Sequence, residues 1–260
     1  MAKLSTAKSV NIGVDFSQPP FGQQDLQGNL TGFDIDIATY IAQALGIPKS
    51  GIHWVQVTPS NREPYLEQGK VDYIAAAYAI TAARQKVIGF AGPYLDSTNA
   101  LLVKKGNPEN LATNSSLAGK KICAATGSDQ AAQIKTVYPK AQLVTFDVET
   151  KCVTALQNGQ VDAFGAGIGV LAGDIEQNPT TVQILPGQWG TTGYYGIGIK
   201  KGDTAFCQFI DTTLEKAKSS GFYAQSWNQT FGPLLNPPGT KDPTPVPSFT
   251  IQPCSTTAPN

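Results

Sequence analysis

A seven-residue pattern occurs twice in this chain, ninety positions apart. Residues 66–72 read LEQGKVD and residues 156–162 read LQNGQVD, with leucine, glycine, valine and aspartate at matching places. In both copies a glycine of the kind that ends helices precedes a short apolar stretch typical of a buried strand. A repeated unit of this kind indicates two lobes of similar construction, and 260 residues are enough to give each lobe a core.

Strand and helix patterns alternate along both halves, which predicts an α/β fold. Residues 10–16 and 71–80 read as strands, 33–45 as an amphipathic helix, and 60–69 as a short helix with Ser60 and Glu63 as a capping box. We expect lobe 1 to comprise residues 1–100 and 193–260, with an extended proline-rich tail at 236–260, and lobe 2 to comprise residues 101–192. The similar turns at 103–106 and 199–202 are the expected hinges.

The composition argues against several classes of protein. The formal net charge is zero and 15% of residues are charged, which disfavours partners bound through bulk charge, such as nucleic acids or membrane surfaces. No run of eighteen apolar residues exists, so no transmembrane segment is expected. His53 is the only histidine, which argues against a histidine-based triad or a multi-histidine metal site. We expect a monomer without a cofactor or metal.

The four cysteines fit neither a zinc motif nor a CxxC motif. Their even number and the export-like composition favour two disulfides. Nearness in sequence and placement by lobe suggest the pairs Cys123 with Cys152 and Cys207 with Cys254; four buried free thiols are the alternative. We therefore expect an extracellular or periplasmic protein, whose signal or lipoprotein leader is not in this sequence.

Arginine is rare in this chain, where Arg62 and Arg84 stand against seventeen lysines. Arg84 comes just after the predicted strand at 71–80, in the region where open α/β sheets bind ligands. A guanidinium group can bind a carboxylate through two parallel hydrogen bonds, which an ammonium group cannot. We therefore expect Arg84 to face a ligand cleft; an ion pair between the lobes is the alternative.

Several motifs in order resemble the polar amino-acid solute-binding proteins of bacterial ABC importers, most closely the actinobacterial glutamate-binding type. They are PPF at 19–21, GFDIDIA at 32–38, GKVD at 69–72, ITAAR at 80–84, FAGPY at 90–94, GKKICAATGS at 119–128 and YGIGIKKGD at 195–203. The resemblance implies the two-lobed type II periplasmic-binding-protein fold, with two strands crossing the hinge. It also implies a protein that is not an enzyme, and that presents a small solute to an ABC permease.

The resemblance assigns binding roles to individual residues. Arg84 would bind the carboxylate of the ligand, and Asp15 and Phe16 would line the cleft. Thr126, Ser128 and Asp129 would contribute hydroxyl and backbone N–H groups at a helix start, which is a ready anion site. Plain helix capping is the alternative for these three residues.

Three departures from the family pattern remove polar partners from the expected cleft. Gly167 stands where family members carry an aspartate for the ligand's α-ammonium group, and Ala77, Ala79 and Ala125 replace polar residues. An ammonium group buried without a carboxylate is costly, so an ordinary α-amino acid is doubtful as the ligand. The aromatic residues Phe16, Tyr78 and Phe164 favour a bulkier or less polar ligand, in a pocket altered by natural divergence or by engineering.

Other interpretations remain open. A shifted alignment would give the role of the missing aspartate to Asp162 or Asp174. The same scaffold could carry a dehydratase of the cyclohexadienyl or prephenate type, with Asp15 or Asp129 as general acid. It could also serve as the ligand-binding module of an extracellular sensor.

Overall fold

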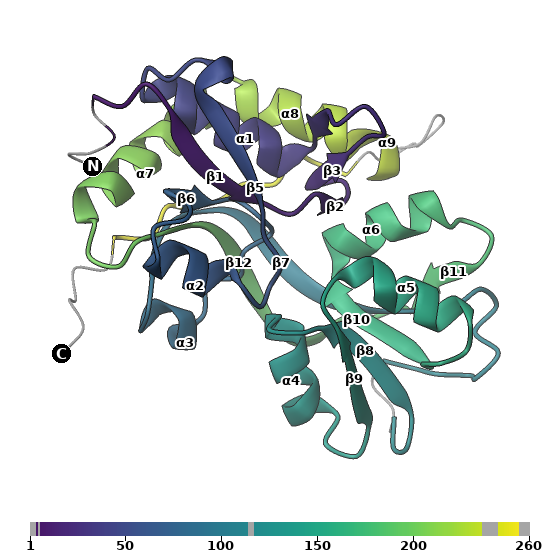
Figure 1. Ribbon diagram of the computed structural model, residues 1–260. Helices are drawn as coiled ribbons and strands as arrows, with labels where there is room; N and C mark the ends of the chain where they lie inside the picture. Colours follow the sequence, from purple (N-terminus) through teal and green to yellow (C-terminus); the bar gives the residue numbers. More distant parts are fainter. Residues whose placement is uncertain (1–3, 5, 114–116, 236–243, 255–260) are drawn as a thin grey trace.

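The chain folds into two α/β lobes joined by a long pair of antiparallel strands (Figure 1). The computed structural model describes residues 4, 6–113, 117–235 and 244–254. Strands β7 (Gly89–Lys104) and β12 (Trp189–Ile199) run through both lobes and belong to one sheet, whose order is β5-β1-β6-β12-β7-β10-β8-β9 with β11 paired to β7. This architecture confirms the predicted two-lobed α/β fold.

Lobe 1 holds the parallel strands of the first half of the sheet and a small three-stranded sheet. Its strands are β1 (Val10–Val14), β2 (Ser17–Gln18), β3 (Gly22–Gln24), β4 (Leu30–Thr31), β5 (Ile52–Gln56) and β6 (Tyr73–Ile74). Its helices are α1 (Phe33–Ala44), the 3-10 turn η1 (Lys49–Gly51), α2 (Arg62–Glu67), α3 (Ala82–Gln85), α7 (Thr204–Ser219), α8 (Phe222–Thr230) and α9 (Gly232–Leu235).

Lobe 2 repeats the strand–helix alternation around the other half of the sheet. Its strands are β8 (Lys121–Ala125), β9 (Gln142–Phe146), β10 (Ala163–Gly167) and β11 (Val182–Ile184), and its helices are α4 (Asp129–Val137), α5 (Glu149–Gln157) and α6 (Ile168–Gln177). The two copies of the repeated sequence lie at matching places, because each runs from the end of a helix (α2 or α5) into a buried strand (β6 or β10).

The two turns predicted as hinges do not lie at the boundary between the lobes. Ile199 pairs with Tyr73 and Gly89 inside lobe 1, whereas Lys104 pairs with Val182 inside lobe 2. The two turns therefore lie at opposite outer ends of the strand pair. The chain crosses between the lobes nearer its middle, around Asn99, where the pairing of β7 with β12 ends and its pairing with β10 begins.

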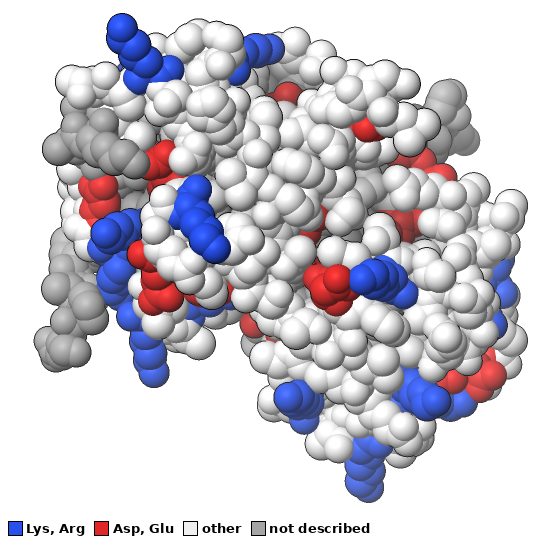
Figure 2. Space-filling model, viewed as in Figure 1, with Lys and Arg blue, Asp and Glu red and all other residues white. Residues whose placement is uncertain are grey.

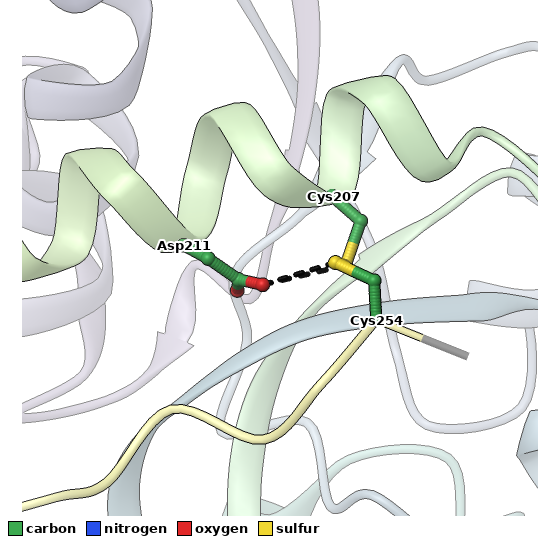
Figure 3. A group of neighbouring side chains, drawn as sticks. All are labelled: Cys207, Asp211 and Cys254. Atoms are coloured by element: carbon green, nitrogen blue, oxygen red, sulfur yellow. Dashed lines mark hydrogen bonds between the residues drawn. A yellow bond between two sulfur atoms is a disulfide. The ribbon is translucent and has the colours of Figure 1, made fainter. Parts of the chain in front are cut away.

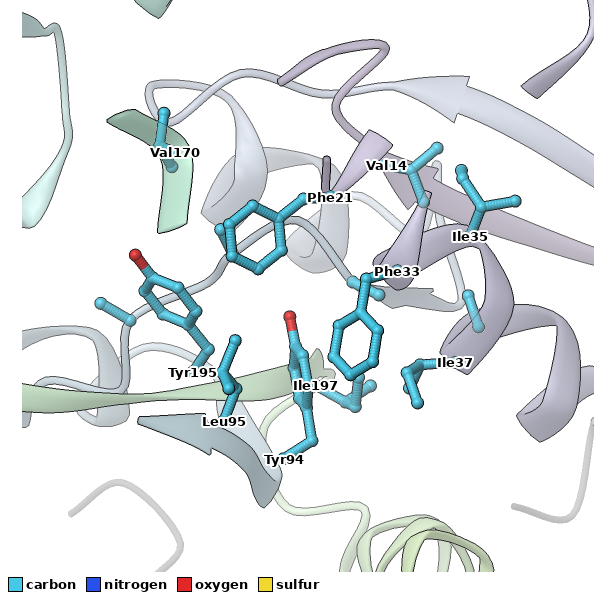
Figure 4. Close-up of a cluster of buried hydrophobic side chains, with 14 of the residues drawn as sticks. Val14, Phe21, Phe33, Ile35, Ile37, Tyr94, Leu95, Val170, Tyr195 and Ile197 are labelled. Atoms are coloured by element: carbon cyan, nitrogen blue, oxygen red, sulfur yellow. The ribbon is translucent and has the colours of Figure 1, made fainter. Parts of the chain in front are cut away.

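The largest apolar core among the described residues spans both lobes, and Figure 4 shows part of it. Phe21 packs edge-on against Tyr195 with ring centroids 5.6 Å apart, and Val170 of helix α6 belongs to the same buried cluster. Apolar contact thus extends from one lobe to the other around the cleft. Helices α1, α7 and α8 cover lobe 1 on the side away from lobe 2.

Two local predictions in lobe 1 were wrong. The strand expected at 71–80 is regular only at Tyr73–Ile74, because Ala77 adopts a positive φ of 43° that interrupts the extended backbone. Ser60 does not cap helix α2, whose N-cap residue is Asn61, and Glu63 pairs with Arg84 instead of closing a capping box.

Both predicted disulfides are present, with Cα atoms 5.6 Å apart for Cys123–Cys152 and 6.0 Å apart for Cys207–Cys254. Asp211 lies beside the second bond (Figure 3), but both sulfur atoms are bonded to each other and are not free to ligate a metal. Residues 244–254 of the predicted tail contain no helix or strand, and Phe249 packs against Tyr223. Residues 236–243 and 255–260 lie outside the described part.

Candidate ligand-binding cleft

A small closed cavity lies between the two lobes. Its lining residues come from both lobes and are Gln18, Pro59, Arg62, Ala77, Ala79, Arg84, Ser128, Asp129, Gln130, Glu149, Ala166, Gly167, Val170 and Tyr195. The volume open to the centre of a water molecule is about 20 Å³, which is room for about one water. A solute of several heavy atoms therefore fits only when the lobes stand further apart than in this closed structure.

Two arginines from lobe 1 flank one tyrosine ring at the cavity. The guanidinium carbon atoms of Arg62 and Arg84 lie 5.1 Å and 5.0 Å from the centroid of the Tyr78 ring. All three residues are buried. Contact with an aromatic face stabilises a guanidinium group and fixes its plane. Lobe 1 thus presents two oriented positive charges at the cleft.

Arg84 is held by contacts on all sides of its guanidinium group. Its Nε pairs with Glu63 at 3.0 Å, one terminal nitrogen donates to the Ala79 carbonyl at 2.8 Å, and the other donates to the Gly127 carbonyl at 2.9 Å. Because Gly127 belongs to lobe 2, the last bond links the lobes directly. Burial, followed by the charge of Arg62, lowers the pKa of Arg84 from its usual value. The ion pair of Arg84 thus lies within lobe 1, and the contact that crosses to lobe 2 is a hydrogen bond and not the ion pair of the alternative interpretation.

Arg62 was not predicted as a site residue. It is 3% exposed, and its Nε and one terminal nitrogen have no hydrogen-bond partner among the described residues. An unpaired buried guanidinium group is unfavourable unless something else satisfies its donors. The scarcity of arginine was the signal in the sequence that could have identified this residue.

Glu149 is an acidic residue of lobe 2 that sequence reasoning also missed. It is the first residue of helix α5, is 6% exposed, and its Oε2 has no hydrogen-bond partner among the described residues. Burial and the nearby charge of Asp15 raise the pKa of Glu149 to about 7, against the opposing charge of Arg62. Lobe 2 therefore brings a second carboxylate to the cavity wall besides that of Asp129, although residues 163–169 carry none.

The position that the family pattern gives to aspartate is closed to any side chain here. A Cβ atom at Gly167 would overlap the hydroxyl group of Tyr195, which is buried at the cavity wall. The backbone at Gly167 has a φ of −62°, which any residue can adopt. Space rather than backbone conformation therefore excludes a larger residue in the closed structure.

The predicted site residues divide into two groups. Those that line the cavity are Ala77, Ala79, Arg84, Ser128, Asp129 and Gly167. Those that do not line it are Asp15, Phe16, Tyr78, Ala125 and Thr126. Phe164 is fully buried in the core on β10, so its predicted contribution to the cleft surface was wrong. The side chain faces the core because successive residues of a strand point to opposite faces.

Two of these residues have clear local structural roles. Ser128 caps helix α4 by accepting a hydrogen bond from the Ala131 N–H at 3.1 Å. Asp15 Oδ1 accepts from the Ser17 N–H at 3.0 Å and from the Gln56 side chain at 3.1 Å, and its buried Oδ2 has no hydrogen-bond partner in the described part of the chain. Capping is thus present at Ser128, as the alternative interpretation allowed, and it coexists with a place on the cavity wall.

Asp34 positions the irregular segment before Arg84. Its carboxylate accepts from the Ala77 N–H at 2.7 Å and from the Tyr94 hydroxyl at 2.6 Å. Burial raises the pKa of Asp34 to about 6, although these hydrogen bonds oppose the rise. The aspartate of the GFDIDIA motif thus supports the strained backbone at Ala77 from beneath.

Basic and acidic side chains are interspersed over the largely uncharged face seen in Figure 2, and several of opposite sign lie next to each other. Among the described residues, no helix is both long and apolar enough to cross a membrane. These features agree with the charge balance of the sequence.

Known proteins match this chain over most of its length. The glutamate-binding protein GluB of Corynebacterium glutamicum is 32% identical over 232 residues, which cover 86% of this chain and 79% of GluB. An ancestral arginine-binding protein bound to arginine has a TM-score of 0.80 at 31% identity, over 87% of this chain and 99% of that one. The solute receptor for L-cysteine of Neisseria gonorrhoeae has a TM-score of 0.85 at 25% identity, over 92% and 96% of the two chains.

All three relatives are named for a solute that they bind and not for a reaction, in agreement with the prediction of a protein without enzymatic activity. Residues 10–233 match the family described as bacterial extracellular solute-binding proteins, family 3. The chain belongs to this family of solute-binding proteins.

Proposed function

We propose that this protein captures a small carboxylate-bearing solute outside the cell membrane and presents it to an ABC permease. The observation that carries the proposal is the pair of buried guanidinium groups, Arg62 and Arg84, at the wall of the cavity between the lobes. Two positive charges held against one tyrosine ring favour an anionic group in the cleft. The relatives bind amino acids according to their names, which supports a solute of that size.

The proposed ligand contacts are those predicted from the sequence. Arg84 binds the carboxylate, and Ala77, Ala79, Ser128, Asp129 and Gly167 form the nearest wall. Asp15, Phe16, Tyr78, Ala125 and Thr126 do not line the cavity in this structure, and we propose that they contact a solute only when the lobes stand further apart. Because position 167 carries no carboxylate, an amino acid cannot be bound with its ammonium group at that position.

Binding is proposed to close the lobes about strands β7 and β12. The change of the strand paired with β7 at Asn99, and the register shift of β12 between Trp189 and Gly193, support lobe boundaries near residues 100 and 193. A solute would enter the separated lobes and replace contacts such as the Arg84–Gly127 hydrogen bond. Closure of this kind needs only small dihedral changes in a few residues.

The test is calorimetric titration of the Arg84→Ala variant with the solute that gives the largest thermal shift in a screen of amino acids, amines and small carboxylic acids. We expect affinity for a carboxylate solute to fall by about 1.5–3 kcal/mol, the scale of a charged hydrogen bond, or roughly 10- to 150-fold. Lys86→Ala, two positions away on an exposed side chain, is the matched control and should bind normally. Unchanged affinity in Arg84→Ala would contradict the role of Arg84.

A further inference from the structure

The cleft contains buried charges of opposite sign that do not pair with each other. Arg62 of lobe 1 and Glu149 of lobe 2 line the same cavity, and each has polar atoms without a hydrogen-bond partner among the described residues. Gln18 lines the cavity beside them with an unpartnered Oε1, and Asp15 has an unpartnered Oδ2 close by. Buried charges left unpaired are costly, so the arrangement is suited to a molecule that supplies the missing partners.

We propose that Glu149 binds a cationic N–H group of the solute, an ammonium or guanidinium group, on the lobe 2 side of the cleft. This assignment rests on the proposed function and names the solute class as a compact zwitterion. The carboxylate of the solute would face the arginines of lobe 1, and its cation would face Glu149 across the gap.

The unpartnered atoms have the chemistry that such a solute requires. Glu149 Oε2, Gln18 Oε1 and Asp15 Oδ2 are acceptors, and an ammonium group brings three donors. The free nitrogens of Arg62 are donors that match a carboxylate. A neutral or purely anionic solute would leave the carboxylate of Glu149 unpaired in a buried site.

The Tyr195 hydroxyl occupies the space that a side chain at position 167 would need. The cation therefore has to be bound elsewhere on lobe 2. Ser128 and Gln130 line the cavity without a charge, while Asp129 is engaged by Gln133. Glu149 is the remaining carboxylate that lobe 2 brings to the cavity wall in the described part of the chain.

The assignment predicts a pH dependence of binding. Glu149, with a pKa of about 7, faces Asp15 of lobe 1, Arg62 of helix α2, Asp174 of helix α6 and Tyr195 of β12. Glu149 has to lose its proton to pair with a cation, so binding releases a proton below pH 7. Affinity for a zwitterion should therefore rise about tenfold from pH 6 to pH 8, the change in ionised fraction of a group with this pKa.

Asp174 also titrates in this range, because burial and the charge of Glu149 raise its pKa to about 8. The Asp174→Asn variant separates the two groups. It should keep the increase in affinity with pH, whereas Glu149→Gln should lose it.

The experiment compares amino acids with the 2-hydroxy acids that replace their ammonium group by a hydroxyl: L-alanine with L-lactate, and L-glutamate with L-2-hydroxyglutarate. A third pair, L-arginine and its 2-hydroxy analogue, extends the range of size. Titration calorimetry on the full chain should show at least one amino acid binding tenfold or more tightly than its hydroxy partner. In Glu149→Gln this preference should fall below threefold, while in the control Glu176→Gln, an exposed residue of helix α6, it should persist.

The possible failures are distinguishable. Hydroxy acids that bind as tightly as the amino acids, and lose affinity in Arg84→Ala, would overturn the role of Glu149 and leave the proposed function standing. The same conclusion follows if Glu149→Gln keeps both its melting temperature and the full preference for the amino acid. Absence of binding by both members of every pair would overturn the proposed function, and this assignment with it.

Discussion

The two lobes contribute to the cleft in different ways. Lobe 1 supplies large side chains fixed by their neighbours, with Arg62 and Arg84 on the Tyr78 ring and Arg84 bonded further to Glu63 and Ala79. Lobe 2 supplies smaller residues such as Ser128 and Gly167, together with the carboxylates of Asp129 and Glu149. Under the proposed function, lobe 1 would hold its arginines in place and lobe 2 would complete the site on closure.

The lobes also differ in their covalent support. The disulfide Cys123–Cys152 links strand β8 to helix α5, and both cysteines are fully buried in lobe 2. The disulfide Cys207–Cys254 fastens the tail to helix α7 of lobe 1, and Cys254 is only partly buried. The disulfide of lobe 2 thus lies in its interior, and the disulfide of lobe 1 lies near its surface.

Removal of the disulfides should have the largest effect on stability. In the chain-entropy account, loops of 47 and 29 residues correspond to about 4 and 3.6 kcal/mol of unfolding free energy. Calorimetry of the Cys207→Ser/Cys254→Ser and Cys123→Ser/Cys152→Ser variants should show losses of this order. The lobe 2 variant should lose more than the loop length predicts, because two buried apolar sulfurs become hydroxyl groups.

Mild reduction gives a second comparison of the same bonds. The partly exposed Cys207–Cys254 bond should react with dithiothreitol before the buried Cys123–Cys152 bond, as followed by alkylation and mass spectrometry. Faster reduction of the lobe 2 bond would contradict the proposed difference between the lobes.

The next largest effect is expected from a substitution in helix α6 where it contacts the loop at Pro19, and it concerns lobe closure. A Cβ atom at Gly173 would overlap the Pro19 carbonyl oxygen of lobe 1. Gly173→Ala should therefore disfavour the closed state by about 1–3 kcal/mol, the cost of overpacking. Small-angle scattering should show a larger radius of gyration, and solute affinity should fall by roughly 5- to 150-fold.

Gly232→Ala is the control for this substitution. A Cβ atom there would lie 3.8 Å from its nearest neighbour, Asn228, which is ordinary van der Waals contact. The control should leave the scattering curve and the affinity unchanged. An unaltered closed shape in Gly173→Ala would show that this contact does not limit closure.

The smallest effects concern the helix caps on either side of the cleft. Thr81 accepts from the Arg84 N–H at 3.2 Å in lobe 1, and Ser128 accepts from the Ala131 N–H at 3.1 Å in lobe 2. Substitution of either residue by alanine should cost about 1 kcal/mol in thermal or urea unfolding.

Ser128→Gly sharpens this comparison, because glycine at an N-cap costs only a few tenths of a kcal/mol. If the Ser128 hydroxyl contacts the solute, Ser128→Gly should still lose affinity in calorimetry. Normal affinity would restrict Ser128 to its structural role.

The sequence was informative where local pattern decides structure. Apolar periodicity predicted the helix at residues 33–45, which is observed at Phe33–Ala44. The cysteine spacing and the repeated LxxGxVD unit likewise led to the correct disulfides and to two lobes. Arg84 lines the cavity from the short helix α3 (Ala82–Gln85), which follows the segment that the sequence predicted as a strand.

The remainder depends on contacts between distant segments. Glu149 begins a helix, a place where acidic residues are common at surfaces, and it is buried only because strand β2 of lobe 1 packs against helix α5. Ala77 has a positive φ supported by the carboxylate of Asp34, forty-three positions earlier. Neither feature has a signal in the neighbouring residues, since each requires the assembled lobes.

One consequence follows from where the two disulfides lie. Each closes a loop within a single lobe, so neither disulfide links lobe 1 to lobe 2. The disulfides can therefore stabilise each lobe against unfolding without restricting the proposed motion of one lobe relative to the other. The stability that the disulfides give and the motion between the lobes thus depend on different parts of the protein. A substitution at one of these parts can change its property and leave the other property unchanged.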